Sequence, residues 1–312
     1  MPGSDNPAVA VIGPTGSGKS RLGLALAIRF RGEIISCDAL QIYRNMDVGT
    51  AKASPGERDA VTHHMLDLRN PSDYFSAGDY QRLARQALNE VRRREHLPFV
   101  VGGSGFYLRA LIEGLFEGPG REEEVRSRLR RIIARKGVER LHKVLRGADP
   151  EAAARIRTTD EARIIRALEV CRRTGKPMSW WQSRPRDALH GFRWLKMGIA
   201  LPRQELYRRI NIRVEQMIEA GFVEEVRSLL QQCPREGQAL KAIGYGQIAD
   251  HLEGRKSLPQ AIEDIQRETR RYAKRQLTWF RRDPAIVWFD GSDWDELLRR
   301  TGQLVDQFLQ QA

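Results

Sequence analysis

Two hydrophobic patterns alternate along this chain: short apolar runs, and longer stretches with an apolar residue at every third or fourth position. From the short runs we predict strands at residues 8–12, 32–36, 97–101, 192–201 and 285–289. Helical periodicity dominates between them, for example over residues 76–94. Strands separated by helices predict an α/β fold, in which helices cover both faces of a parallel sheet.

The first predicted strand leads directly into the stretch IGPTGSGKS. It matches the P-loop spacing G-x-x-x-x-G-K-[ST], in which backbone N–H groups turn toward an anion at the start of a helix. The predicted phosphate-binding loop is Gly13, Pro14, Thr15, Gly16, Ser17, Gly18, Lys19 and Ser20. We expect Lys19 to contact phosphate oxygens and Ser20 to ligate Mg²⁺. By itself the motif indicates nucleotide binding, with ATP as the usual ligand.

A long segment between the third and fourth strands, residues 118–191, shows helical periodicity only. The turn-rich stretches EGPGREEE and TGKPMSWWQSRPRDALHG mark its entry and its exit. We therefore predict a P-loop core domain formed by residues 1–117 and 192–312, interrupted by an all-helical insertion domain.

The charge distribution points to a polyanionic partner. The chain has 312 residues and a formal net charge of +13. Residues 121–176 hold 17 Lys and Arg against 9 Asp and Glu, and residues 255–282 hold 9 against 3. Because the binding of many phosphates releases counterions, this excess favours a nucleic acid over a single nucleotide. A solvated basic surface is the alternative.

The three cysteines, Cys37, Cys171 and Cys233, form no C-x-x-C pair, so neither a disulfide framework nor a zinc site is predicted. No apolar run approaches the ~20 residues of a membrane span, and the N-terminus does not resemble a signal peptide. We expect a cytoplasmic protein in a reducing compartment that has no contact with membranes. A monomer is the simplest oligomeric state.

The carboxylate that an ordinary ATPase places after a second apolar strand is missing from this sequence. The run LPFVVGGSG ends instead in Gly102 and Gly103. Asp38 follows the strand at residues 32–36, and parallel topology would bring it to the same sheet edge as the P-loop. Asp38 is therefore a candidate general base, although an N-cap of the following turn would explain it equally well.

Eight ordered stretches resemble one family over nearly the whole chain, the tRNA dimethylallyltransferases. They are GPTGSGKS, IISCDALQIYRNMDVGTAK, HHMLDL, VVGGSGFYLRAL, ARIIRALEVCRRTGKP, LYRRINIRVEQMIEAGFVEEV, KAIGYGQ and TRRYAKRQLTWFRR. The resemblance implies a core similar to that of P-loop kinases, with a helical insertion. It also implies transfer of a dimethylallyl group from its diphosphate to N6 of the adenosine 3′ of certain anticodons (position 37), with release of diphosphate.

The resemblance assigns three catalytic residues. Asp38 matches the family's catalytic aspartate, which takes a proton from the poorly nucleophilic adenine amine. Arg213 matches an arginine that reaches the diphosphate, and Ser104 stands where the family usually has threonine. Mg²⁺ and the P-loop would stabilise the leaving diphosphate.

The resemblance also implies contacts with the anticodon stem-loop of tRNA. The matching positions are Asp38, Ala39, Leu40, Gln41, Ser104, Arg126, Ala162, Arg163, Ile164, Ile165, Arg166, Lys241, Ala242, Ile243, Gly244, Tyr245, Gly246 and Gln247. Ala39 departs from a frequent serine and Gly246 from a frequent basic residue. The residues themselves add a basic helix face that bears Arg267, Arg271, Lys274 and Arg275, while Ala273, Leu277 and Phe280 face inward.

Three other functions remain open on this sequence. Transfer of the prenyl group to free adenine nucleotides would suit the same core, as in the related adenylate dimethylallyltransferases, but it does not account for the basic segments. A small-molecule P-loop kinase is more distant. A non-catalytic RNA-binding NTPase is the last alternative. The chain has no Cys and His pairs after the core, which favours a bacterial-type enzyme over the zinc-finger-bearing eukaryotic relatives.

Overall fold

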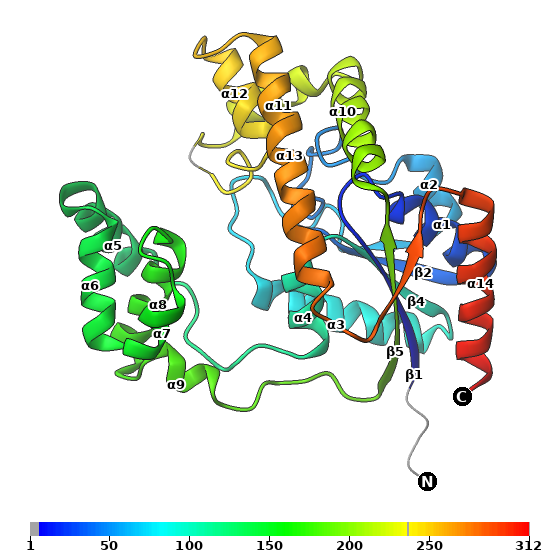
Figure 1. The fold of residues 1–312 in the computed structure, drawn as a ribbon, viewed down its shortest axis with the longest axis horizontal. Coiled ribbons are helices and arrows are strands. Elements are labelled where there is room, and N and C mark those ends of the chain that lie inside the picture. The colour runs from blue at the N-terminus through cyan, green and yellow to red at the C-terminus, as the bar shows by residue number, and fades with distance from the viewer. Residues whose placement is uncertain (1–5, 236, 312) are drawn as a thin grey trace. The chain divides into compact units, whose positions relative to one another are not determined.

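The computed structural model describes residues 6–235 and 237–311 and forms two compact units (Figure 1). The core unit comprises Met1–Ile112 and Leu189–Ala312, and the insertion unit comprises Glu113–Ala188. The insertion thus begins and ends a few residues earlier than predicted. Phe116 packs on the hydrophobic cluster of the insertion unit, whereas Leu189 donates its N–H to Ile112 O (2.9 Å) and packs on the core unit.

The core unit is built on one parallel sheet of six strands in the order β3-β2-β4-β1-β5-β6. The strands are β1 (Asn6–Ile12), β2 (Gly32–Cys37), β3 (His63–His64), β4 (Leu97–Gly102), β5 (Phe192–Ala200) and β6 (Ile286–Asp290). The five predicted strands are confirmed. The sequence did not indicate β3, because a strand of two histidines is too short to show a hydrophobic period.

Alternate residues of the strands pack against different helices, as the period of two requires. Ala8, Ala10 and Ile12 of β1 belong to a cluster that includes the buried side chains of α3 (Ala77–Arg93). Val9 and Val11 belong to a second cluster with α1 (Lys19–Arg29) and α14 (Trp294–Gln310). Both sheet faces are therefore covered by helices, and the predicted α/β fold is confirmed.

Helices supply the rest of the core unit, and the insertion unit is helical throughout. The remaining core helices are α2 (Pro55–Ala60), α4 (Gly105–Ile112), α10 (Arg203–Glu219), α11 (Phe222–Gln232), α12 (Tyr245–Leu252) and α13 (Leu258–Phe280). The insertion helices are α5 (Glu123–Lys136), α6 (Val138–Ala148), α7 (Pro150–Arg155), α8 (Glu161–Thr174) and α9 (Met178–Gln182). The helix predicted at residues 76–94 is α3, which begins with a capping box between Ser76 and Asp79.

Strand register brings the chemistry-bearing loops together. Gly102 at the end of β4 pairs with Ile12 of β1 on one side and with Cys37 of β2 on the other. The loops that follow these three strands consequently leave from one edge of the sheet. They are the P-loop, the segment that starts at Asp38, and the turn that holds Ser104.

Candidate functional site

The P-loop connects β1 to α1 and presents backbone N–H groups at the start of that helix. Gly16 (φ 81°) and Gly18 (φ 90°) adopt the left-handed conformation that glycine tolerates best. Gly18 is also the N-cap of α1, and no side chain caps that helix end. The first turn of α1 therefore offers its N–H groups and the positive end of the helix dipole to an anion.

Two of the predicted loop N–H groups are already donated within the protein. The N–H of Thr15 is donated to Gln276 Oε1 (2.9 Å) and that of Ser17 to Pro14 O (3.3 Å). Contact of these two residues with phosphate stays a prediction, since both N–H groups are engaged within the ligand-free protein. The remaining loop amides and the first turn of α1 form the proposed anion cradle.

Lys19 lies in a strongly electrostatic environment. Its Nζ donates to Pro14 O (3.3 Å), a bond within the loop. Burial and the neighbouring Arg213 together lower the pKa of Lys19 to about 8, while Asp38 acts in the opposite direction. Lys19, Arg213 and Asp38 thus lie near enough to influence one another electrostatically, and the carboxylate offsets part of the repulsion between the two cations.

Asp38 is held in a defined orientation at the end of β2. Its Oδ1 accepts the N–H of Leu40 (2.9 Å), so the carboxylate does cap the following turn. The two interpretations of Asp38 are compatible, since the turn orients the carboxylate toward the side where Lys19 and Arg213 interact with it.

Ser104 lies beside Asp38 because β2 and β4 are neighbours. The N–H of Ser104 donates to Cys37 O (3.1 Å), and Tyr272 of α13 lies near the side chain of Ser104. Burial raises the pKa of Tyr272 to about 12, so this phenol stays protonated. The backbone of Ser104 is therefore fixed, and the predicted catalytic hydroxyl has a neutral phenol as its neighbour.

Gly102 and Gly103 stand where an ATPase would have its carboxylate because the space is filled. A Cβ on Gly102 would lie 2.1 Å from Cys37 O, and one on Gly103 would lie 2.3 Å from Gln276 Nε2. Gln276 of α13 donates this Nε2 to Gly103 O (2.8 Å). The sequence analysis missed Gln276. The sequence does hold a hint of its role, because Gln276 is a polar residue that lies between the inward-facing Ala273 and Leu277.

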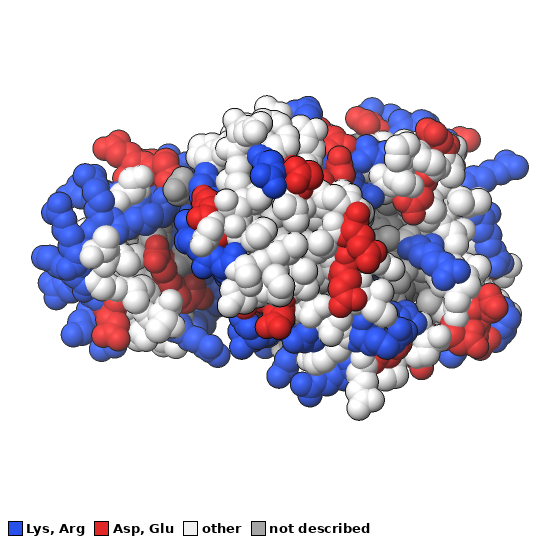
Figure 2. All heavy atoms as spheres, turned by 90° about the horizontal axis from the view of Figure 1, so that it is seen from above, with Lys and Arg blue, Asp and Glu red and all other residues white. Residues whose placement is uncertain are grey.

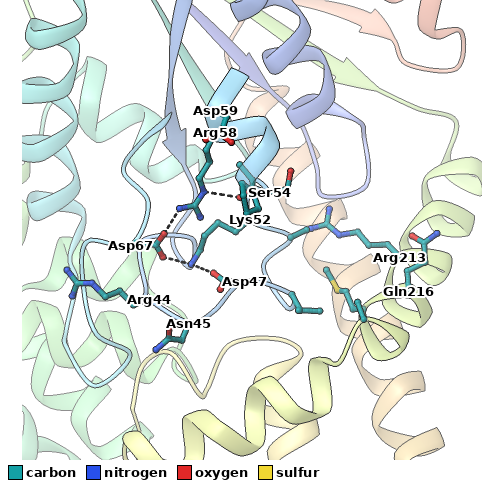
Figure 3. A pocket seen from close by; sticks show the side chains of 16 residues that line it. Arg44, Asn45, Asp47, Lys52, Ser54, Arg58, Asp59, Asp67, Arg213 and Gln216 are labelled. Atoms are coloured by element: carbon teal, nitrogen blue, oxygen red, sulfur yellow. Dashed lines mark hydrogen bonds and ion pairs between the residues drawn. The ribbon is translucent and has the colours of Figure 1, made fainter. Parts of the chain in front are cut away.

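Arg213 reaches the site from α10. Its Nη2 lies 3.4 Å from Thr50 O and donates to it, and burial lowers the pKa of Arg213, while Asp38 opposes that effect. Figure 3 shows the guanidinium extending from α10 toward the loop that holds Lys52. That Arg213 reaches the diphosphate stays a prediction, but its burial excludes the solvated helix residue that the sequence pattern alone resembled.

The segment after Asp38 is held in place by its own side chains. Gln41 accepts a hydrogen bond from Ser36 Oγ (2.8 Å) and donates to Thr50 O and Ala51 O (3.3 Å each). The amide of Gln41 is thus engaged within the loop, and contact of Gln41 with tRNA stays a prediction. Leu40 and Ala39 pack partly against the core.

A cavity of about 890 Å³ lies beside this segment (Figure 3). Arg213 and Met217 of α10 line one side, and residues 44–59 with Asp67 line the other. The buried Lys52 Nζ donates to Tyr43 O (2.7 Å), Asp47 (2.6 Å) and Asp67 (2.7 Å). Because its charge is compensated by two carboxylates, Lys52 stabilises the cavity wall.

Glu225 of α11 fixes the tip of the same loop. Its carboxylate accepts the N–H groups of Asp47 (2.8 Å), Val48 (2.7 Å) and Gly49 (3.1 Å), and the hydroxyl of Tyr245 (2.7 Å). Sequence analysis missed Glu225, which resembles an ordinary helix-surface acid. The predicted RNA contact of Tyr245 is wrong, since this side chain is fully buried against α11.

The insertion unit has a buried ion-pair cluster. Glu169 is fully buried and accepts from Arg126 (2.8 Å), from Arg166 (2.8 Å) and from the N–H of Glu122 (2.8 Å). Despite burial, which raises it, the pKa of Glu169 falls to about 2 through these hydrogen bonds, chiefly that from Arg126. Arg126 of α5 therefore joins that helix to Glu169 of α8, and Arg166 of α8 completes the cluster.

The other insertion positions divide by exposure. Ile164 and Ile165 lie in the hydrophobic interior, at 0% and 2% exposure, so direct tRNA contact by these side chains is wrong. Ala162 and Arg163 at the start of α8 are exposed. Figure 2 shows many lysine and arginine side chains on the surface of the insertion unit. They include Arg128, Arg131, Arg135 and Lys136 of α5 and Arg140 and Lys143 of α6.

The predicted tRNA-contact positions before and within α12 differ in how far they are exposed to solvent. Lys241 is exposed, Ala242, Ile243, Gly246 and Gln247 are partly buried, and Gly244 is buried. The side-chain amide of Gln247 accepts the N–H of Gly244 (2.8 Å). Lys241 is thus the cation that this stretch offers to an outside partner.

The basic face of α13 is confirmed as exposed. Arg267, Arg271, Lys274 and Arg275 are exposed, while Ala273 and Phe280 are buried and Leu277 is partly buried. Arg267 and Arg271 form ion pairs with acidic residues of the same helix. Lys274 and Arg275 extend this face toward the end of α13 that carries Gln276.

Within residues 6–235 and 237–311, no three or more His, Cys, Asp or Glu side chains gather in a way that could hold a metal ion. The described helices include none that is long and apolar enough to span a membrane.

The comparisons with known proteins agree on one family. The model of the IPP transferase family matches residues 41–283. The chain is 47% identical to the tRNA dimethylallyltransferase of Solibacter usitatus over 283 residues, which is 90% of this chain and 92% of that protein. The corresponding protein of Geobacillus thermodenitrificans is 47% identical over 286 residues, covering 91% and 90% of the two chains.

Solved structures are similar as well. The tRNA isopentenylpyrophosphate transferase of Bacillus halodurans superimposes with a TM-score of 0.73 at 39% identity, covering 98% of this chain and 97% of that one. A eukaryotic dimethylallyltransferase acting on tRNA superimposes with a TM-score of 0.82 at 26% identity, covering 98% of this chain and 80% of that one.

Proposed function

This chain belongs to the IPP transferase family, and on that basis we propose that it is a tRNA dimethylallyltransferase. It transfers the dimethylallyl group of dimethylallyl diphosphate to N6 of adenosine 37 in tRNA. The observation that carries the proposal is the convergence of Asp38, Lys19 and Arg213 at the P-loop edge of the sheet. An anion cradle with a carboxylate beside it suits a reaction in which diphosphate leaves and an amine loses a proton.

Asp38 is the general base in this proposal. The lone pair of the adenine amine is delocalised into the ring, so the amine needs a base as the new C–N bond forms. The turn bond from Leu40 orients the carboxylate, and nearby Lys19 and Arg213 keep it in a positive field. Ser104 lies next to Asp38 and is positioned to contact the leaving oxygen or the base.

The leaving diphosphate is stabilised by donors and positive charge. Lys19, Arg213, the amides of Gly16 and Gly18, and the first turn of α1 surround the place where its charge develops. The exposed Ser20 at the start of α1 carries a hard oxygen ligand that suits Mg²⁺, which takes few protein ligands and completes its shell with phosphates and water. When bound, Mg²⁺ would neutralise charge on the leaving group.

The anticodon stem-loop binds through positive charge. Lys274 and Arg275 on α13, and Lys241 before α12, are exposed cations of the core unit, and the insertion unit adds those of α5 and α6. The target base must leave its stack to reach a recessed site. Because the acceptor is tRNA, the reaction takes place in the cytoplasm, and we propose that the protein acts as a monomer.

One assay tests this function. Purified protein is given radiolabelled dimethylallyl diphosphate with Mg²⁺ and either unmodified tRNA or AMP. We expect label in tRNA and none in AMP. Label in AMP alone would show an adenylate dimethylallyltransferase, and ATP consumption without prenyl transfer would indicate a kinase or an NTPase.

A further inference from the structure

We propose that Gln276 is a positioning residue for prenyl transfer, a role that rests on the proposed function. Gln276 is buried on α13, with 7% of its surface exposed. Its Oε1 accepts the N–H of Thr15 in the P-loop (2.9 Å), and its Nε2 donates to Gly103 O at the end of β4 (2.8 Å). One side chain therefore links the diphosphate loop to the residue that precedes Ser104.

The chemistry of the two partners determines the orientation of this amide. A backbone N–H can only donate and a backbone carbonyl can only accept, so Oε1 must face Thr15 and Nε2 must face Gly103. A buried amide that is bonded at both ends restricts the relative movement of its partners. Gln276 thus sets the distance between the bound diphosphate and the Ser104 hydroxyl.

The glycine at position 103 makes this link possible. A Cβ there would lie 2.3 Å from Nε2, too close for the amide to remain in place. A neutral amide also holds the loop without adding negative charge beside a diphosphate, which a carboxylate at the same place would repel. This explains why the strand end lacks the acidic residue of ordinary ATPases.

The position of Gln276 on α13 connects the diphosphate loop to the basic surface. Lys274 and Arg275 precede it directly and are exposed, whereas Gln276 faces inward. In the proposed complex, one helix contacts RNA with its outer face and holds the diphosphate loop with its inner face. The alignment of the donor with the acceptor base consequently depends on Gln276.

The test compares Gln276→Glu with Gln260→Glu, the same substitution on the same helix. Gln260 is in the capping box at the start of α13, where glutamate serves equally well. At pH 8 the carboxylate of Gln276→Glu faces Gly103 O without a proton to donate. Because small misplacements of reacting groups are costly, we expect kcat/KM for dimethylallyl diphosphate to fall about 100-fold. The Kd for tRNA should match that of Gln260→Glu, whereas the unfolding midpoint should fall, because a buried carboxylate then faces a carbonyl oxygen.

Acidification should rescue Gln276→Glu. As the pH falls, the introduced carboxyl takes up a proton and can again donate to Gly103 O, so its rate relative to wild type rises. The rate is expressed relative to wild type at each pH, so that pH effects common to both proteins cancel. Gln276→Met, which has similar shape and cannot donate, should lose the same activity and show no rescue.

The outcomes separate the two proposals. If the wild-type protein does not transfer label to tRNA, the proposed function fails. If the wild type is active and Gln276→Glu and Gln276→Met both keep the kcat/KM of Gln260→Glu, the positioning role is overturned. A loss of kcat/KM in Gln276→Glu that does not recover at low pH, or that recovers equally in Gln276→Met, also overturns it.

Discussion

Replacing Lys19 by methionine should stabilise the ligand-free protein and abolish diphosphate binding. Lys19 Nζ is bonded to Pro14 O within the P-loop, and Arg213 lies near enough to repel its charge. Burial and this repulsion lower the pKa of Lys19 to about 8, against the partial compensation by Asp38. The ligand-free site therefore holds a positive charge that the folded protein disfavours.

The pKa gives the size of the effect. A change from 10.5 to about 8 corresponds to at most about 3 kcal/mol. The unfolded chain binds more protons than the folded one between these two values, so stability rises with pH across that window. The destabilisation of the folded protein by the charge on Lys19 is present in full below pH 8 and disappears above pH 10.5. At pH 7 Lys19→Met should therefore gain up to about 3 kcal/mol.

Calorimetric unfolding of the ligand-free proteins at pH 7 measures this gain. For a protein of this size 1 kcal/mol corresponds to about 2–4 °C, so Tm should rise by several degrees. Lys19→Arg keeps the positive charge and serves as the control, for which no rise in Tm is expected. Titration with inorganic diphosphate should show binding to the wild type, weakening about tenfold per pH unit above pH 8 relative to Lys19→Arg.

Two results would refute this reasoning. An unchanged or lower Tm for Lys19→Met would show that the folded protein does not disfavour the charge at position 19. A constant ratio of diphosphate affinities between wild type and Lys19→Arg from pH 7 to pH 9 would show that Lys19 does not titrate in that range.

Three further predictions concern the base, the insertion unit and the RNA surface. Asp38→Asn should lower prenyl transfer at least about 100-fold with tRNA affinity retained in filter binding; near-normal turnover would remove Asp38 as the base. Glu169→Gln should destabilise the insertion unit by about 3–5 kcal/mol in calorimetry, because Arg126 and the neighbouring arginine lose their buried partner. In the wild type this stabilisation should be complete above pH ~4.5 and decline as the pH falls toward 2, since the pKa of Glu169 is lowered to about 2. Replacing Lys274 and Arg275 by alanine should weaken tRNA binding and reduce its salt dependence by about one phosphate contact each; an unchanged salt slope would identify the face as solvated only.

Much of the candidate site was predictable because its residues lie in short local patterns. The P-loop spacing, the strand before it and the helix after it occupy consecutive residues, so their signals do not depend on the rest of the chain. Asp38 and Ser104 follow predicted strands, and parallel topology places such loops at one sheet edge. The exposed face of α13 followed from helical periodicity alone.

Several expected contacts were wrong because burial depends on packing partners. Ile164, Ile165 and Tyr245 matched positions expected to contact RNA, yet their side chains lie inside the protein. Gln41 engages its amide within its own loop, and its contact with tRNA stays a prediction. A motif identifies which stretch borders a site, but each side chain in it points either toward the ligand or toward the core.

The sequence by itself determined the parallel α/β order, the P-loop, the carboxylate that follows β2 and the concentration of positive charge. Only the tertiary structure revealed Gln276 and Glu225 as residues that hold the site together. Gln276 contacts the P-loop across 261 positions of sequence, and Glu225 contacts Asp47 across 178. Such pairings leave no local pattern, because they arise only when distant helices pack against the same edge of the sheet.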